Sequence, residues 1–419
     1  MIKLFLSFLE RQNIAYRITN GYEEIEKNTS DYSDYDILFK KNEFKNIDKI
    51  ILNFSLASNL KIVQMYHQGQ YAKNFFLYDP NTLLLLNLDL YGQLSRHNIS
   101  ILDENEVFSK KLMYNGLAIL EPEQEFIQYL IKKIDKEVIS LEAFEKLRNL
   151  FTDKEKKCIT YLKLFFKDSY QQISQILKSS DYDNFQKKNK KFKLDFLNNK
   201  KTAKESFFSK GIRVIGRMIY PTGITIAFLG PDGSGKSTII DGLRKKHLPF
   251  RRDDYFHLKP ILKNNQSNEV VVADPHAKKP YSPLKSYGKL SYFLYQYNMG
   301  WFKNIVLLKR KSSLIIFDRY FDDLLVDSKR YRYGGNKSIA NLMKYFIPRP
   351  SLYFVLTADA NIIHGRKQEV SKDELTRQLK SYSNLEDGKR YVGIDVSKSP
   401  NEIIDEIYEI LMLKMNERY

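Results

Sequence analysis

A glycine-rich segment ending in Gly-Lys-Ser is the part of this chain best suited to chemistry. It follows an apolar run at 224–229 and reads Gly-Pro-Asp-Gly-Ser-Gly-Lys-Ser-Thr over 230–238. Glycines let successive N–H groups turn toward one spot, where the positive end of the following helix also lies. Lys236 can then reach the β- and γ-phosphates of a nucleotide, and the Ser237 hydroxyl can hold Mg²⁺. The spacing predicts a phosphate-binding loop; the alternative is a glycine-rich turn that binds nothing.

The residues expected to contact the nucleotide are Gly230, Asp232, Gly233, Ser234, Gly235, Lys236, Ser237 and Thr238. An amphipathic helix from Thr238 to about Lys246 should follow the loop. Further apolar strands are expected at 313–317 and 351–356, and the first ends in Asp318. Doubly wound sheets bind ligands at the carboxyl ends of their strands, so Asp318 can hold Mg²⁺ from the side opposite Ser237.

These motifs resemble the thymidylate kinase-like branch of the P-loop nucleoside monophosphate kinases, over residues 222 to about 415. The family's loop, Gly-x-Asp-Gly-x-Gly-Lys-Ser/Thr, is matched by 230–237, and its Asp-Arg-Tyr/Phe by 318–320. The resemblance implies a Mg-ATP-dependent kinase with ATP and Mg²⁺ as cofactors. It also implies that Lys236 and Asp318 act in catalysis and that Arg319 grips the acceptor phosphate.

The family's basic lid corresponds to residues 366–378. Arg366 and Arg377 would then contact the donor and neutralise charge on the transferred phosphoryl group, with Arg366 also counted as catalytic. The alternative is that either arginine only pairs with Glu369 or Glu374 on its own helix.

The chain departs from the family where the acceptor should bind. Residues 255–260 read Tyr-Phe-His-Leu-Lys-Pro in place of Arg-Glu-Pro-Gly, and residues 322–335 are unusually charged. Arg330 and Arg332 could hold an acceptor phosphate or a sugar acid, and Asp322 or Asp323 could orient a hydroxyl; the alternative is a solvated charged loop. With Asp274-Pro-His276, these runs resemble a divergent subgroup associated with bacterial surface-polysaccharide gene sets.

A second acidic pattern lies near the N-terminus. Gly21-Tyr22 is followed by Asp34-Tyr-Asp36, and Asp89 lies in a later strand. Carboxylates two residues apart face the same side of a strand, so a third beside them could complete a two-Mg²⁺ centre. This resembles the polymerase-β-like nucleotidyltransferase pattern, with Tyr22 where that family has Ser; the alternative is acidic residues that simply end strands.

The 419 residues suggest two or three domains, and the 43% hydrophobic content indicates a globular chain. The predicted fold class is α/β: a P-loop kinase with a parallel sheet flanked by helices, after a small nucleotidyltransferase-like α/β domain and a helical region. The expected boundaries are 1–105, 106–204 and 205–419. Strands are expected at 35–39 and 83–90. Eight lysines in 186–204 suggest an exposed linker or a solvated helix face. The mixed apolar and basic segment 207–219 suggests a domain interface or a membrane surface.

A net charge of +18 favours anionic partners, namely nucleotides, nucleic acid or acidic lipids. Cys158, the only cysteine, permits no internal disulfide and is expected to be a packing residue, which points to the cytoplasm. No apolar run approaches the roughly 20 residues of a membrane span. We therefore expect a cytoplasmic protein, with peripheral contact at the inner membrane face left open.

The leading hypothesis is an ATP-dependent kinase that phosphorylates a nucleoside monophosphate or a sugar or glycan acceptor in surface-polysaccharide assembly. The first alternative is a true dTMP kinase that makes dTDP. Others are a nucleotide-regulated scaffold bound to membrane or nucleic acid, and a nucleotidyltransferase whose reaction resides in the N-terminal half. Nucleic acid is the less favoured partner, and a homodimer is compatible with the sequence.

Overall fold

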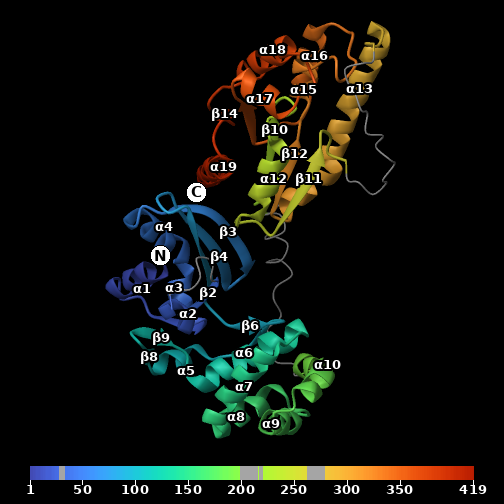
Figure 1. Ribbon diagram of the computed structural model, residues 1–419. Coiled ribbons are helices and arrows are strands. Elements are labelled where there is room, and N and C mark those ends of the chain that lie inside the picture. The colour runs from blue at the N-terminus through green and yellow to red at the C-terminus, as the bar shows by residue number, and fades with distance from the viewer. Residues whose placement is uncertain (28–33, 199–215, 217–219, 262–278) are drawn as a thin grey trace. The chain divides into compact units, whose positions relative to one another are not determined.

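The computed structural model describes residues 1–27, 34–198, 216, 220–261 and 279–419. They form two compact units, Met1–Arg213 with Tyr419, and Val214–Arg418 (Figure 1). The described residues leave out most of the 207–219 segment and the whole of 274–276. They also leave out Lys200, Lys201 and Lys204 of the lysine-rich stretch. Each unit is described by itself.

A seven-stranded mixed sheet, in the order β3-β4-β5-β2-β1-β9-β8, forms the centre of the first unit. The strands are β1 (Tyr16–Asn20), β2 (Asp34–Phe39), β3 (Lys61–Gly69), β4 (Ala72–Asp79), β5 (Leu84–Tyr91), β8 (Leu112–Tyr114) and β9 (Leu117–Ile119), with a separate pair β6 (Ser95–Arg96) and β7 (Ile99–Ser100). β2 and β5 are parallel and place Asp36 directly opposite Asp89. The two strands expected in this region are therefore present and adjacent.

The β8–β9 hairpin corrects the expectation that the chain is helical from residue 106. Asn115 and Gly116 connect the two strands with φ values of 47° and 84°. Two consecutive residues at positive φ make the turn that matches the twist of a hairpin, and Asn-Gly is the sequence that favours it. The first unit's sheet thus extends past residue 105, to Ile119.

Ten helices are described in this unit: α1 (Ile2–Arg11), α2 (Tyr22–Lys27), α3 (Lys41–Lys45), α4 (Ile47–Ala57), α5 (Glu104–Ser109), α6 (Pro122–Lys136), α7 (Leu141–Asp153), α8 (Glu155–Phe165), α9 (Tyr170–Ser179) and α10 (Tyr182–Asn198). α5 to α10 share one apolar core, which also includes Leu38 of β2 and Cys158. On α10, Phe185, Phe192 and Phe196 are buried. The lysine-rich stretch is therefore the solvated face of a packed helix as far as Asn198.

The second unit has a five-stranded sheet in the order β11-β12-β10-β13-β14. The strands are β10 (Ile224–Leu229), β11 (Arg252–His257), β12 (Ser313–Asp318), β13 (Leu352–Thr357) and β14 (Tyr391–Asp395), and every pairing is parallel. All residues of β10 and β12 are buried, as expected for strands covered on both faces. Because the strands are parallel, their carboxyl ends meet at one edge.

The helical elements of this unit are α12 (Lys236–Lys245), α13 (Pro283–Gly300), a π-helical turn η1 (Trp301–Ile305), α14 (Val306–Arg310), α15 (Asp322–Val326), α16 (Lys337–Lys344), α17 (Ala360–Arg366), α18 (Lys372–Ser383) and α19 (Pro400–Asn416). α13, α15 and α18 join one core with alternate residues of β10, β12 and β13. α12 packs against α19 and β12, and α19 against β14. The predicted fold class is confirmed: an α/β unit with a parallel sheet flanked by helices.

Candidate functional site

The loop between β10 and α12 has a backbone that its glycines make possible. Gly230, Gly233 and Gly235 have φ values of 151°, 85° and 82°. A Cβ at Gly230 would lie 2.7 Å from the carbonyl oxygen of Leu356, and one at Gly233 would lie 3.0 Å from Lys367 Cβ. The loop is therefore packed against β13 and the segment after α17 so closely that side chains at these positions would clash.

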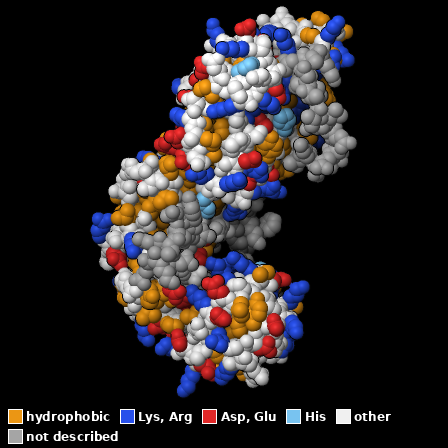
Figure 2. Space-filling view, viewed as in Figure 1, with side chains coloured by type: hydrophobic (Ala, Val, Ile, Leu, Met, Phe, Trp, Pro, Cys, Tyr) orange, Lys and Arg blue, Asp and Glu red, His pale blue; other side chains and the backbone are white. Residues whose placement is uncertain are grey.

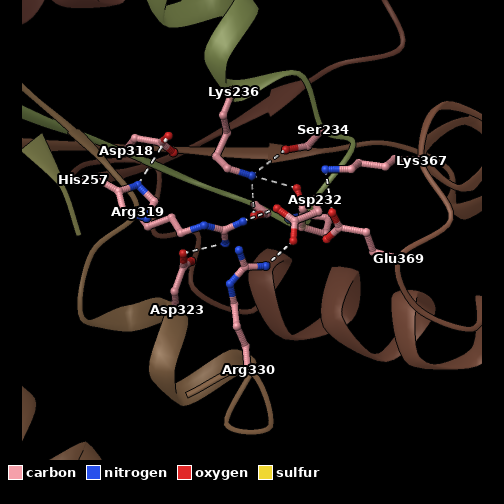
Figure 3. Close-up of polar contacts among 12 residues, drawn as sticks. Asp232, Ser234, Lys236, His257, Asp318, Arg319, Asp323, Arg330, Lys367 and Glu369 are labelled. Atoms are coloured by element: carbon pink, nitrogen blue, oxygen red, sulfur yellow. Dashed lines mark hydrogen bonds and ion pairs between the residues drawn. The ribbon is translucent and has the colours of Figure 1, made fainter. Parts of the chain in front are cut away.

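Lys236, the first residue of α12, turns its ammonium back into the loop. Nζ donates to the carbonyl oxygens of Gly230 and Pro231, both at 2.8 Å, and to Ser234 Oγ at 3.3 Å (Figure 3). Burial and, to a smaller extent, the charge of Arg319 lower the pKa of Lys236 to about 8, against the opposing effect of nearby carboxylates. The loop therefore encloses a cation that lacks a full counter-charge.

Asp318 lies at the carboxyl end of β12, beside Phe228 of β10 and His257 of β11. Its Oδ2 accepts a hydrogen bond from Tyr255 at 2.9 Å and lies 3.8 Å from His257 Nδ1. Burial raises the pKa of Asp318, but the contacts with His257 and Tyr255 and the charge of Lys236 outweigh it, so that the pKa lies below its usual value. Oδ1 is buried, and no described residue hydrogen-bonds to it.

This orphaned oxygen fits a divalent cation. Mg²⁺ prefers oxygen ligands and usually takes one or two from the protein, leaving the rest to phosphates and water. Asp318 Oδ1 and the exposed hydroxyl of Ser237 are oxygens of that kind. Within the described ranges, no group of three or more His, Cys, Asp or Glu side chains converges on one point, which agrees with so sparse a set.

Asp232 of the loop connects two arginines. Its Oδ1 accepts from Arg319 Nη2 and its Oδ2 from Arg330 Nη1 (Figure 3). Arg319 follows β12 with φ 74°, and its Nη1 donates to Asp323 Oδ2 at 3.0 Å. The side chain of Arg319 is 5% exposed. Arg330, proposed from the sequence as an acceptor ligand, thus lies at the nucleotide loop.

The charged segment 322–335 is not a solvated loop throughout. Asp322 and Asp323 are buried. Asp323 accepts a hydrogen bond from Tyr382 at 2.8 Å, and Asp322 pairs with Lys344. Both oxygens of Asp323 and Oδ1 of Asp322 are therefore engaged within the protein.

Arg332 lies apart from the loop, with its guanidinium 4.1 Å from the centre of the Tyr281 ring. It also donates to the carbonyl oxygen of Lys279 at 3.0 Å. Of the two arginines singled out from the sequence in this segment, only Arg330 reaches Asp232.

The lid arginines contact other parts of the unit. Arg377 pairs with Glu374 through Nε at 2.9 Å and Nη2 at 2.7 Å, as the alternative interpretation of this residue expected. The hydrogen bond from Arg377 lowers the pKa of Glu374 to about 2. Arg366 instead donates to the carbonyl oxygen of Val396 at 2.9 Å.

Two contacts of the site were missed in the sequence. Tyr255 and His257 contact Asp318. Alternation along a strand predicts that these two side chains lie on the same face of β11. The pairing of β11 with β12, which brings them to Asp318, is not visible in the sequence. Glu369 hydrogen-bonds to Asp232, which raises the pKa of Glu369. Lys367 pairs with Glu369 at 2.5 Å.

Beside the loop, α12 and the start of α19 border an open groove of about 550 Å³. Thr238, Lys245, Asn401 and Ile404 are among the residues that line it. Thr238 is the last of the residues that the sequence predicts to contact the nucleotide, so the groove adjoins the predicted nucleotide-binding loop.

In the first unit, the acidic residues are engaged by protein groups. Asp36 Oδ2 pairs with Lys132 of α6 at 2.7 Å, and Oδ1 accepts from Tyr91 at 3.1 Å. Asp89 Oδ1 accepts from Asn74 at 2.7 Å. The side chain of Asp34 lies outside the described residues. An ammonium and a phenol therefore engage both oxygens of Asp36, and a metal ion at this carboxylate would have to displace them.

The surface adds little about partners. Figure 2 shows Lys and Arg side chains spread over the visible face with Asp and Glu between them. None of the described helices combines the length and the apolar character that a membrane span requires. On the face that is visible, the described basic side chains therefore mark no single patch.

No protein-family model matches this chain. Among solved structures, it is similar to a thymidylate kinase from Candida albicans, with 19% identity and a TM-score of 0.34, covering 46% of this chain and 93% of that one. It is also similar to a thymidylate kinase from Ehrlichia chaffeensis, with 18% identity and a TM-score of 0.33, covering 45% and 98%.

Proposed function

We propose that the second unit is a kinase that transfers a phosphoryl group from Mg-ATP to a phosphate- or hydroxyl-bearing acceptor. One observation carries the proposal: a lysine buried in a glycine loop interacts electrostatically with a strand-end carboxylate that has an orphaned oxygen. Lys236 supplies the cation, and Asp318 Oδ1 supplies a metal ligand. A polyphosphate with its Mg²⁺ needs both.

Each residue of the site has a separate role in the proposed reaction. Phosphate oxygens are stronger acceptors than carbonyls, so a bound triphosphate replaces the carbonyl partners of Lys236. The backbone N–H groups of the loop and the start of α12 hold the same phosphates. Ser237 and Asp318 would hold Mg²⁺, which neutralises charge on the donor. Arg319 binds the acceptor, and Arg366 approaches the transferred group after leaving Val396.

Because residues 255–260 depart from the Arg-Glu-Pro-Gly segment of thymidylate kinases, the acceptor need not be dTMP. A nucleoside monophosphate and a sugar or glycan are both compatible with the site, and a dTMP kinase is the narrowest form of the first class. The surface-polysaccharide role rests on the sequence resemblance.

The test is transfer of label from γ-labelled ATP with Mg²⁺ to a panel of nucleoside monophosphates, sugar phosphates and glycan lipids. Lys236→Ala should abolish transfer while circular dichroism and the unfolding midpoint stay near those of the wild type. Lys414→Ala, which removes a partly exposed lysine of α19, is the matched control. Full activity in Lys236→Ala would refute the assignment.

The panel also separates the alternatives. Label on dTMP would make the protein a thymidylate kinase, and label only on a sugar or glycan would support the polysaccharide role. If ATP binds but no acceptor takes label, a nucleotide-regulated scaffold replaces the kinase. Liposome or nucleic-acid binding should then depend on ATP and fall with salt.

A nucleotidyl transfer centre in the first unit is the second candidate, favoured by the pairing of Asp36 with Asp89 on neighbouring parallel strands. It predicts an activity that Asp36→Asn removes and Lys236→Ala leaves intact. If neither variant changes incorporation of nucleotide from α-labelled NTPs, this candidate fails.

A further inference from the structure

Two guanidinium groups from separate segments meet at one carboxylate beside the nucleotide loop. Arg319 follows β12, Arg330 lies beyond α15, and Asp232 accepts one contact from each (Figure 3). Each arginine takes a different oxygen of the carboxylate. A carboxylate or phosphate group of a ligand binds to paired guanidinium groups in the same way.

Contacts that do not involve Asp232 also hold both arginines. Arg319 is fixed by the 3.0 Å bond to Asp323, which Tyr382 supports from its other oxygen. The turn that carries Arg330 is fixed by its backbone N–H, which donates to Asp327 Oδ1 at 3.1 Å. If Asp232 moved away, Arg319 would therefore keep its position, and Arg330 would remain on an anchored turn.

Asp232 is the movable member of the trio. Its side chain is short and 21% exposed, and it projects from a loop rather than from a helix or strand. Its remaining contact is a hydrogen bond with Glu369, itself a carboxyl group on the exposed segment after α17. Rotation about χ1 of Asp232 would withdraw its carboxylate. The positive charges of Arg330 and Lys236 would then lack this negative charge. A ligand anion would restore the balance, because an uncompensated charge in a partly buried site is unfavourable.

We propose that Arg319 and Arg330 together bind an anionic group of the acceptor, and that the Asp232 carboxylate occupies this place between binding events. The inference rests on the proposed kinase function and narrows it. The acceptor must carry a phosphate or a carboxylate, which admits nucleoside monophosphates, sugar phosphates and sugar acids and excludes neutral sugars. Arg330 becomes a specificity-determining residue, and Asp232 an internal competitor of the acceptor.

The first experiment uses inorganic phosphate as the probe, by calorimetric titration in the presence of Mg²⁺ and a saturating non-hydrolysable ATP analogue, so that the donor loop, including the γ-phosphate position, is already filled. Arg330→Gln should weaken phosphate binding at least about tenfold, because it removes a charge-assisted bond. Asp232→Asn should strengthen it by roughly tenfold, because the competing charge is lost while the side-chain volume is kept. Acetate in place of phosphate distinguishes a carboxylate site from a phosphate site.

Arg252→Gln is the matched control. It removes another arginine paired with a carboxylate, Asp254, at the opposite end of β11 from the site. This variant should bind phosphate as the wild type does. Wild-type affinity in Arg330→Gln, or no gain in Asp232→Asn, would overturn the proposal.

Failure of this proposal and failure of the kinase assignment can be told apart. If the ATP analogue with Mg²⁺ does not bind the wild type, the kinase assignment falls, and phosphate alone still tests the two arginines. If the analogue binds and the affinity for phosphate is the same with and without Arg330, only the acceptor site falls. In a transfer assay, Arg330→Gln should raise the KM for the acceptor and leave the KM for ATP unchanged.

Discussion

Tyr255 donates to Oδ2 of Asp318 at 2.9 Å across two neighbouring parallel strands, while Oδ1 of the same carboxylate is buried with no hydrogen-bond partner in the described part of the chain. An orphaned buried oxygen is unfavourable unless a ligand satisfies it. The pair therefore presents one fixed and one available oxygen at the carboxyl edge of the sheet. This is the arrangement by which a single carboxylate can contribute to a Mg²⁺ site.

Asp318→Asn should reduce Mg²⁺-dependent phosphoryl transfer by at least about a hundredfold, because the amide cannot provide the anionic ligand that fixed Mg²⁺ sites use. The apparent Mg²⁺ requirement, measured as rate against Mg²⁺ concentration, should rise. Tyr255→Phe keeps Oδ1 and removes only the support of Oδ2, so its loss should be about tenfold or less. Equal rates in Asp318→Asn and the wild type would exclude Asp318 from the metal site.

Asp323→Ala should destabilise the second unit by on the order of 3 kcal/mol, because it leaves the buried guanidinium of Arg319 with one carboxylate partner fewer. Urea unfolding followed by circular dichroism measures the effect. Glu406→Gln breaks the exposed pair between Lys398 and Glu406 and should leave the midpoint unchanged. If the two variants unfold alike, the buried pair makes no net contribution.

Gly230→Ala should destabilise the same unit by roughly 2 kcal/mol or more, since the residue has φ 151° and the new Cβ would lie 2.7 Å from a backbone oxygen. Gly365 of α17 provides the comparison, because a Cβ there meets nothing within 4 Å. Gly365→Ala should stabilise the unit by up to about 1 kcal/mol through helix propensity. Thermal unfolding of both variants checks the signs, and a stable Gly230→Ala protein would contradict the packing of the loop.

Cys158 should be inert in the folded protein. Burial raises the pKa of its thiol to about 12, and the charges of Glu123 and Asp153 add to the shift. Alkylation by iodoacetamide at pH 8 should be slow until urea unfolds the first unit, since only the thiolate reacts. Fast labelling of native protein would refute its burial.

The same thiol gives a pH dependence of stability. The unfolded thiol ionises near pH 8.5, whereas the folded thiol keeps its proton until about pH 12. Between these values the unfolded state binds fewer protons, so this group lowers stability as pH rises through that window and has no effect below it. Cys158→Ser or Cys158→Ala should remove this contribution from the measured pH profile of unfolding.

Local patterns predicted the strand, glycine loop and helix around Lys236, because the conformation of this segment depends on adjacent residues. Glycine spacing, the apolar run before the loop and the amphipathic helix after it place Lys236 without knowledge of the rest of the chain. Asp318 could also be located, because it ends a strand and parallel strands meet at one edge. The Asn115-Gly116 hairpin was readable by the same kind of local rule and was missed.

Contacts between distant segments could not be read from the sequence. The approach of Arg330 to Asp232 depends on how residues 322–335 fold back over the loop, and nothing at either position indicates the other. The same is true of Lys132, which joins Asp36 from a helix almost a hundred residues later. Such pairs are decided by tertiary packing, which propensity and periodicity do not encode.

The close crossing of α12 and α19 has a consequence for the order in which the chain is made. A Cβ at Gly242 would lie 2.2 Å from Ile404 Cδ1, so the last helix covers the back of the helix that begins with Lys236. On the ribosome, the glycine loop and α12 emerge long before α19 has been made and can pack against α12. A chain that has not yet reached residues 400–416 lacks the surface against which α12 packs, so the position of this helix is settled only late in synthesis.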